Sequence, residues 1–305
     1  MTGELHMSAL PPAAWLDVSF TSQDGLRLYA RHYPAIAASS GRRPVLCLPG
    51  LTRNSRDFHD VAQVLSTDPI ASRDVYTLDS RGRGASDHDP DWKHYSVPVE
   101  TTDALDFLTA RDLHGAAVIG TSRGGILAMM MAAARPTGIG AAILNDVGPI
   151  IERNGLARIM AYVGRIPVPA DWAEAARMAL DMTREQFPHL TSADADALAR
   201  QWFNDANGKP VPAYDAAIAK SLTLPDGPMP ALWKQFGALS HVPVLVLRGG
   251  TSDLLTETSV AEMGRRHPNL TAHTVPDEGH APLLRDAATQ AVIQAFLQRT
   301  DAATG

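Results

Sequence analysis

The segment GTSRGG at residues 120–125 separates the apolar run AAVI (116–119) from the helix-forming run ILAMMMAAAR (126–135). An apolar run followed by a helical run predicts a strand that leads through a very short turn into a helix. Gly120, Ser122 and Gly124 satisfy the G-x-S-x-G spacing of a strained turn that projects a serine hydroxyl from the edge of a sheet. Small neighbours are needed because a bulky side chain there would collide with the strand or the helix. Ser122 is therefore the candidate nucleophile.

Strand and helix patterns alternate along most of the chain on both sides of this turn. Short runs rich in Val, Ile, Leu and Ala predict strands over 15–22, 26–33, 44–50, 74–80, 116–120, 141–146, 242–249 and 271–276. Helical patterns occupy 55–66, 99–112, 124–135, 259–267 and 286–299. The first two strands flank a QDG turn, which predicts an antiparallel hairpin. We expect an α/β fold with a mostly parallel eight-stranded sheet flanked by helices.

The alternation breaks once, between about residues 150 and 238. Helical patterns there are separated by Pro, Gly and Asn, and the segment contains no convincing strand pattern. We therefore expect residues 1–149 and 239–305 to form the α/β core. Residues 150–238 are predicted to be a helical cap inserted between the sixth and seventh strands.

Composition limits the functions that this chain can have. Its 305 residues are 45% hydrophobic, and its formal net charge is −6. Lys and Arg are scattered, so a nucleic-acid partner is not expected. The apolar run GILAMMMAAA is about half the ~20 residues that a membrane span needs. No signal peptide is evident, which favours a cytoplasmic location, and the single cysteine, Cys47, excludes an internal disulfide and a cysteine-pair metal site.

A serine hydroxyl needs a base and a group that orients the base. Asp253 follows the seventh predicted strand, and His280 follows the eighth, so Ser122, Asp253 and His280 have the chain order of a hydrolase triad. Asp146, at the end of the sixth strand, is an alternative to Asp253. Chain order favours Asp253 as the residue that holds the imidazole, which leaves Asp146 to cap a loop or anchor the lid.

The chain as a whole resembles the α/β-hydrolase fold superfamily with a helical cap. Besides the serine turn, the segment DSRGRGASD (79–87) is similar to the turn after the family's fourth strand, and LPGLTRNSRDF (48–58) is similar to its oxyanion loop. By position, the resemblance implies that the backbone N–H groups of Leu51 and Arg123 bind the oxyanion. Pro49 stands where many relatives have His, so the hydrogen bonds that support this loop must differ.

These features predict a cofactor-independent serine hydrolase that acts, through an acyl-enzyme, on a small or medium ester, thioester or lactone. Carbon–carbon bond hydrolysis and perhydrolysis use the same fold, and a non-catalytic ligand receptor or scaffold is the alternative from another class. No dinucleotide or H-E-x-x-H motif is present, so neither a nucleotide cofactor nor a metal is expected. The expected partner is a small-molecule substrate, and no oligomeric state is indicated.

The side chain of Arg123 lies beside the nucleophile but is not required for an oxyanion hole, which uses the backbone N–H. A guanidinium at a helix N-terminus is unfavourable to the helix dipole. We expect a structural ion pair, for example with Asp146 or Glu152. Recognition of a substrate carboxylate is the alternative.

Overall fold

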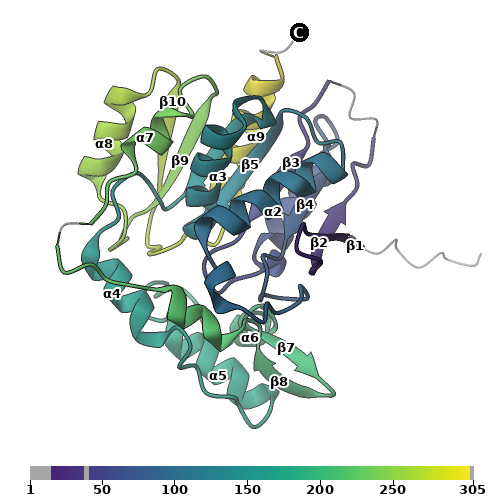
Figure 1. Cartoon of the computed structure of the whole chain (residues 1–305), viewed down its shortest axis with the longest axis vertical. Coiled ribbons are helices and arrows are strands. Elements are labelled where there is room, and N and C mark those ends of the chain that lie inside the picture. Colours follow the sequence, from purple (N-terminus) through teal and green to yellow (C-terminus); the bar gives the residue numbers. More distant parts are fainter. Residues whose placement is uncertain (1–14, 38–40, 228, 303–305) are drawn as a thin grey trace, which may run out of the picture.

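The computed structural model describes residues 15–37, 41–227 and 229–302. Its main feature is a sheet of eight strands, confirming the predicted α/β class (Figure 1). In spatial order the strands are β1 (Leu16–Thr21), β2 (Arg27–Tyr33), β4 (Val75–Leu78), β3 (Val45–Leu48), β5 (Ala116–Thr121), β6 (Ile139–Asn145), β9 (Val244–Gly249) and β10 (Leu270–Val275). β2 pairs antiparallel with both β1 and β4, and all other neighbours are parallel.

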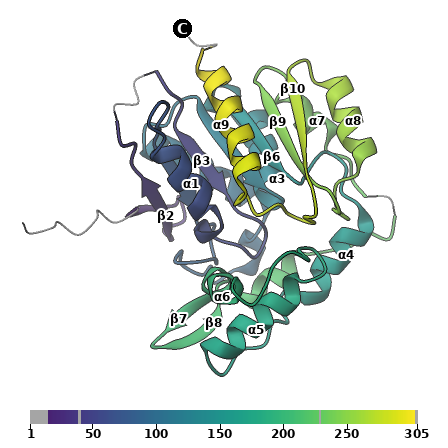
Figure 2. The ribbon, with the colours of Figure 1, turned by 180° about the vertical axis from the view of Figure 1, so that it is seen from behind.

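Helices cover both faces of this sheet, which explains why its central strands are apolar on both sides. One face carries α2 (Val97–Ala110), α3 (Arg123–Ala134), α7 (Trp233–Gly237) and α8 (Glu257–Arg266). The other carries α1 (His59–Ser66) and α9 (Ala287–Ala302) (Figure 2). Two hydrophobic clusters, one on each face, form the core. Short 3₁₀ turns lie at Ser55–Phe58, Trp92–His94 and Pro136–Gly138. The helices of the described residues are too short or too polar to cross a membrane.

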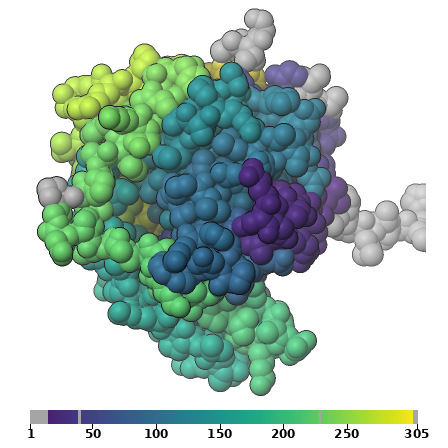
Figure 3. Space-filling model, in the orientation of Figure 1, coloured from purple at the N-terminus to yellow at the C-terminus, as the bar shows by residue number. Residues whose placement is uncertain are grey.

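Most of the segment between β6 and β9 folds below the end of the sheet where the parallel strands terminate (Figure 1). In the space-filling view this teal and green segment forms the lower part of the molecule (Figure 3). It contains α4 (Arg153–Tyr162), α5 (Trp172–Thr183), α6 (Ala195–Trp202) and a 3₁₀ helix (Ala216–Ser221). α5 and α6 pack against each other through their own apolar cluster. A second cluster, which includes Tyr95, Ile159 and Tyr214, joins this segment to the loops of the sheet. Near the end of this segment α7 packs on the face of the sheet, so we refer to the part before it, residues 150–231, as the cap.

The expectation that the cap contains no strand is wrong. β7 (Phe203–Ala206) and β8 (Lys209–Pro212) form an antiparallel hairpin within it. Asn207 and Gly208 both have positive φ angles at the turn, which is the Asn-Gly signature of a tight hairpin. The strands are only four residues long, and β8 contains two prolines, so the strand pattern around this turn signal is weak.

Candidate active site

Ser122 occupies a sharp turn between β5 and α3, as its sequence context predicted. Its φ angle is +51° and its ψ angle is −113°, a sparsely populated backbone conformation that costs about 1–3 kcal/mol. The flanking glycines permit the close contacts that hold this turn. A Cβ on Gly120 would lie 2.5 Å from the backbone of Gly124, and a Cβ on Gly124 would overlap the carbonyl of Leu48 in β3. The glycines therefore allow β5, α3 and β3 to meet directly behind the serine.

His280 and Asp146 form a hydrogen-bonded chain with this serine. Ser122 Oγ is 2.9 Å from His280 Nε2, and His280 Nδ1 is 2.8 Å from Asp146 Oδ2. The side chain of His280 is 7% exposed, and that of Asp146 is fully buried. An imidazole that donates from Nδ1 to a carboxylate presents its unprotonated Nε2 to the hydroxyl. Ser122 and His280 thus come together as predicted, 158 residues apart in the chain.

The structure does not bring Asp253 to the imidazole as predicted, because Asp253 does not hydrogen-bond to His280. Its carboxylate forms a two-point ion pair with Arg158 of α4, with distances of 2.6 and 2.8 Å. The hydrogen bonds from Arg158 hold the pKa of Asp253 below its usual value. Asp253 lies beyond the end of β9 and faces the cap, whereas Asp146 directly follows the neighbouring strand β6. Asp146, the alternative that chain order disfavoured, is the carboxylate that lies at hydrogen-bond distance from the imidazole.

The end of β9 and the loop after it donate hydrogen bonds to Asp146. Asp146 has a φ angle of +53°, which turns the chain sharply at the end of β6. The Gly249 backbone N–H donates to Asp146 Oδ1 over 2.8 Å, and the Ser252 hydroxyl donates to Oδ2 over 2.5 Å. With the imidazole, this carboxylate has three partners, which compensates for its burial.

The cap holds the loop that carries His280. The backbone carbonyl of Gln186 accepts from Gly279 N–H over 2.7 Å, and its side-chain Oε1 accepts from His280 N–H over 2.8 Å. A Cβ on Gly279 would overlap the Gln186 side chain, so glycine is needed for this approach. Sequence analysis missed Gln186, and nothing local to it in the sequence marks the contact, because the loop it binds lies about 94 residues away.

The two backbone N–H groups expected to bind an oxyanion lie on segments that border the serine. Arg123 is the first residue of α3, so its N–H has no acceptor within the helix. Leu51 follows Gly50, where an added Cβ would lie 3.9 Å from Ser122 Cβ. The loop after β3 therefore passes directly beside Ser122.

One buried carboxylate, Glu100 of α2, connects these two segments. Its Oε2 is 2.6 Å from Arg123 Nε, and its Oε1 is 2.7 Å from Arg83 Nη1. Arg83 also donates from Nε to the carbonyl of Leu51 over 2.8 Å. Burial alone would raise the pKa of Glu100, but the charges of Arg123 and Arg83 outweigh it and hold this pKa below its usual value. Sequence analysis did not identify either Arg83 or Glu100.

The side chain of Arg123 is part of this network. Its guanidinium is in an ion pair with Glu100 and also donates to the Tyr95 carbonyl over 3.3 Å. The expected structural role agrees with this geometry, although the partner is neither Asp146 nor Glu152. Arg83 supplies a hydrogen bond to the loop in which Pro49 replaces the histidine of many relatives.

A cavity of about 130 Å³ opens onto Ser122 and His280. The core contributes Gly50, Leu51 and the loop after His280, and the cap contributes side chains of α4, α5, α6 and the segments between them. The apolar lining includes Ile159, Tyr162, Met182, Phe187, Leu198 and Trp202. Its charged lining consists of Arg53, Arg158, Arg285 and Asp57. The cavity suits an organic molecule that is partly apolar and partly polar.

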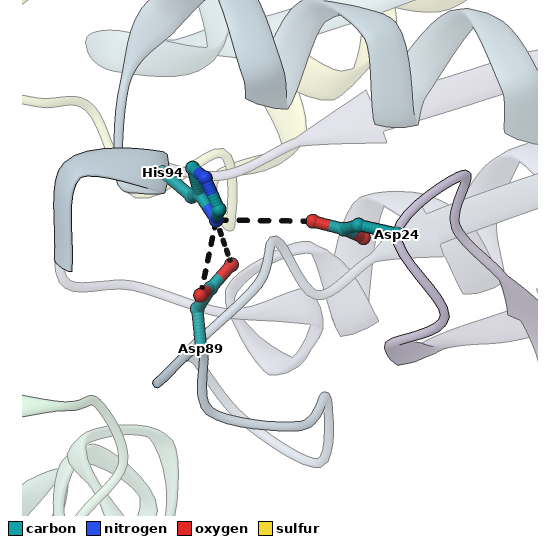
Figure 4. Close-up of side chains that lie close together, drawn as sticks. All are labelled: Asp24, Asp89 and His94. Atoms are coloured by element: carbon teal, nitrogen blue, oxygen red, sulfur yellow. Dashed lines mark hydrogen bonds and ion pairs between the residues drawn. The ribbon is translucent and has the colours of Figure 1, made fainter. Parts of the chain in front are cut away.

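A separate cluster outside this cavity brings together Asp24, Asp89 and His94, residue types that can bind metals (Figure 4). His94 Nδ1 lies 3.0 Å from Asp89 Oδ2 and 3.9 Å from Asp24 Oδ2. The buried guanidinium of Arg81 is 2.7 Å from Asp24 and 2.6 Å from Asp89, and it also pairs with Asp103. Because Arg81 already neutralises these carboxylates, the cluster is an ion-pair network that supports the fold.

Comparison with known proteins agrees with this architecture. The model of the alpha/beta hydrolase family matches residues 45–295. A 3-hydroxybutyrate-oligomer hydrolase from Cupriavidus necator is 33% identical over 306 residues, which cover 95% of this chain and 99% of the relative. An esterase from Mycobacterium tuberculosis is 30% identical over 178 residues, 54% of each chain. The crystal structure of an alpha/beta hydrolase from Novosphingobium aromaticivorans has a TM-score of 0.85 at 38% identity, covering 94% of this chain and 99% of the other.

Proposed function

The chain belongs to the alpha/beta hydrolase family, and on that basis we propose that it is a serine hydrolase that cleaves carboxylic esters. Ser122 is the nucleophile, His280 is the general base and acid, and Asp146 orients the imidazole. The observation that carries this proposal is the hydrogen-bonded chain Ser122–His280–Asp146, with distances of 2.9 and 2.8 Å, at the wall of a cavity.

In the first half of the proposed reaction, Ser122 Oγ forms a bond to the carbonyl carbon of the ester. Its proton passes to His280 Nε2, and the positive imidazole is stabilised by the Asp146 carboxylate. When the tetrahedral intermediate collapses, the bond to the alcohol oxygen breaks. His280 returns its proton to that oxygen, and the acyl group remains on Ser122.

In the second half, a water molecule gives a proton to His280 and attacks the acyl carbon. The bond between the acyl carbon and Ser122 Oγ then breaks, His280 returns its proton to Oγ, and the carboxylic acid leaves. The negative oxygen of both tetrahedral intermediates accepts from the backbone N–H groups of Leu51 and Arg123. Fixed donors of this kind favour the transition state because they need no reorientation when charge develops. The Arg83–Glu100–Arg123 contacts support this assignment because they tether both segments.

The substrate class that we propose is a linear ester of hydroxycarboxylic acids. The Cupriavidus necator relative, which aligns over 99% of its length, is named for the hydrolysis of 3-hydroxybutyrate oligomers, whose units are joined by ester bonds. Apolar and arginine side chains together line the cavity, which matches a chain of short apolar units linked by polar ester groups. No observation favours carbon–carbon bond hydrolysis or perhydrolysis over this reaction.

The proposal is tested with a linear 3-hydroxybutyrate trimer and chromatographic detection of dimer and monomer. The wild-type protein is expected to release both. Ser122→Ala is expected to lower kcat on the order of 10³-fold or more, with the melting temperature retained. A folded Ser122→Ala protein with undiminished trimer cleavage contradicts the mechanism. A wild-type protein that cleaves no ester supports the receptor alternative.

A further inference from the structure

The arginines that line the catalytic cavity differ in how their charges are compensated. Arg53 makes a two-point ion pair with Asp57, with distances of 2.8 and 2.6 Å. Arg158 is paired in the same way with Asp253. Each of these two guanidinium groups therefore already has a carboxylate at bidentate distance.

Arg285 has no such bidentate partner among the described residues. Its Nη2 donates to the neutral Oε1 of Gln201 over 2.9 Å. Its ion-pair partner, Asp60, is 3.5 Å from Nε and 47% exposed, so water screens that interaction. Of the cavity arginines, Arg285 has the charge that is most available to a ligand.

Arg285 and Gln201 also line a second, more open recess of about 490 Å³, so the two hollows share a wall. The charged residues that line this recess are Arg31, Arg56, Arg200, Arg285, Asp60 and Asp194. Four guanidinium groups and two carboxylates thus line its described part, and one of the four, Arg200, is also 3.7 Å from Asp205 outside the lining. His59 lines the same recess, and burial lowers its pKa, which favours the neutral form of its imidazole. The recess has an excess of positive charge.

Two further arginines of the recess are not paired with carboxylates in the described part of the chain. Arg56 donates to two amide oxygens, Asn54 Oδ1 at 2.8 Å and Asn204 Oδ1 at 2.9 Å. The Arg31 guanidinium lies 4.0 Å from the centre of the Trp15 ring, and its buried Nε has no hydrogen-bond partner there. Neither guanidinium has a carboxylate at ion-pair distance among the described residues, so both contribute positive charge to the recess.

From this arrangement we infer that Arg285 and the adjoining recess bind a carboxylate at the end of the substrate. The inference rests on the proposed ester hydrolysis and defines the substrate further. In a linear hydroxy-acid oligomer, the acyl side of the cleaved ester goes to Ser122, and the free carboxylate belongs to the part that leaves as the alcohol. The recess beyond Arg285 is therefore the subsite for the leaving portion. Acidic oligomers are preferred over neutral ones because a charge-assisted pair with Arg285 forms only with the carboxylate.

Two trimers that differ in one group test this inference. One ends in the free carboxylate, and the other ends in a primary carboxamide of nearly the same shape, which has no charge and adds no ester bond. The wild-type protein is expected to show a kcat/KM for the acid that is roughly 10-fold or more above that for the carboxamide, the size expected of a charged hydrogen bond. Arg285→Gln is expected to bring this ratio close to one, mainly through the KM for the acid.

Arg265→Gln is the matched control, since it removes one positive charge from an exposed position on α8 far outside the cavity lining. It is expected to keep the wild-type ratio. Calorimetric titration of the Ser122→Ala protein with each trimer compares their dissociation constants without turnover. This substitution leaves the recess unchanged. The trimer that ends in a carboxylate is expected to bind more tightly.

The outcomes separate the inference from the proposed function. Equal kcat/KM values of the wild-type protein for the two trimers overturn carboxylate recognition and leave ester hydrolysis standing. The inference is also overturned when the Arg285→Gln protein keeps the wild-type ratio of the two kcat/KM values, because another residue then recognises the carboxylate. Failure of the wild-type protein to cleave either trimer overturns the proposed function, and the inference with it.

Discussion

Replacing Glu100 by Gln is expected to lower the free energy of unfolding by about 3–5 kcal/mol, the cost of removing one partner from a buried ion pair. The side chains of Glu100 and Arg83 are each 1% exposed, and that of Arg123 is 13% exposed. A carboxamide keeps one acceptor oxygen but presents an NH₂ donor to the other guanidinium. Two buried positive charges then lose the carboxylate that both of them share.

The same substitution is expected to lower activity, because Glu100 tethers both proposed oxyanion segments. Arg83 donates a hydrogen bond to the Leu51 carbonyl, and Arg123 directly follows Ser122. Displacement of either N–H weakens transition-state stabilisation, so kcat on the 3-hydroxybutyrate trimer is expected to fall by roughly 10-fold or more. A purely structural effect would lower stability without lowering kcat in the fraction that remains folded.

Urea unfolding followed by tryptophan fluorescence measures the predicted loss, since the chain has five tryptophans. Glu257→Gln is the matched control: Glu257 is 82% exposed and lies 3.4 Å from Arg248. An exposed pair contributes about 1 kcal/mol or less. The reasoning is refuted when Glu100→Gln and Glu257→Gln change the free energy of unfolding by the same small amount.

The pH dependence of this stability follows from the lowered pKa of Glu100 in the folded protein. A carboxyl whose pKa is lower when folded contributes stability above its unfolded pKa of about 4.3, and this contribution is lost as the pH falls through the folded value. Wild type is therefore expected to lose this part of its stability below about pH 4.3. The Glu100→Gln protein is expected to lack that part of the acid dependence.

Three further substitutions test other parts of the site. Asp146→Asn is expected to lower kcat roughly 10³-fold or more by favouring the wrong imidazole tautomer, whereas Asp253→Asn has a far smaller effect; the reverse ranking reassigns the acid. Gln186→Leu removes the side-chain acceptor of the His280 backbone N–H, so kcat/KM is expected to fall about fivefold, and an unchanged value contradicts the positioning role. Gly124→Ala places a Cβ against the β3 backbone and is expected to prevent stable folding, while Gly264→Ala, with open space around it, keeps the melting temperature or raises it.

The sequence predicted those features that depend on local patterns. All eight strands of the main sheet lie within a few residues of the predicted ranges, because short apolar runs between turn signals are typical of buried parallel strands. The glycines around Ser122 and the glycine before His280 singled out two residues whose side chains the structure places at hydrogen-bond distance. These patterns are local: the residues of a short segment determine its own backbone conformation.

The features that the sequence did not predict depend on contacts between distant segments. Asp146 and Asp253 follow adjacent parallel strands, so both carboxylates end at one edge of the sheet, and sequence position does not show which one turns toward the imidazole. Arg158, which lies in the cap, holds the Asp253 carboxylate in an ion pair. Glu100 and Gln186 likewise act through partners far along the chain, and neither lies in a recognisable motif.

The most direct test of the central claim is site-resolved labelling with a fluorophosphonate probe, which reacts with activated serines. The wild-type protein is expected to take up one label, and peptide mass spectrometry is expected to place it on Ser122. Loss of the base in His280→Ala is expected to slow labelling on the order of 10³-fold or more, whereas Asp253→Asn is expected to be labelled at close to the wild-type rate. A protein that cleaves the trimer while Ser122 stays unlabelled, or one in which His280→Ala is labelled as fast as wild type, would contradict the proposed mechanism.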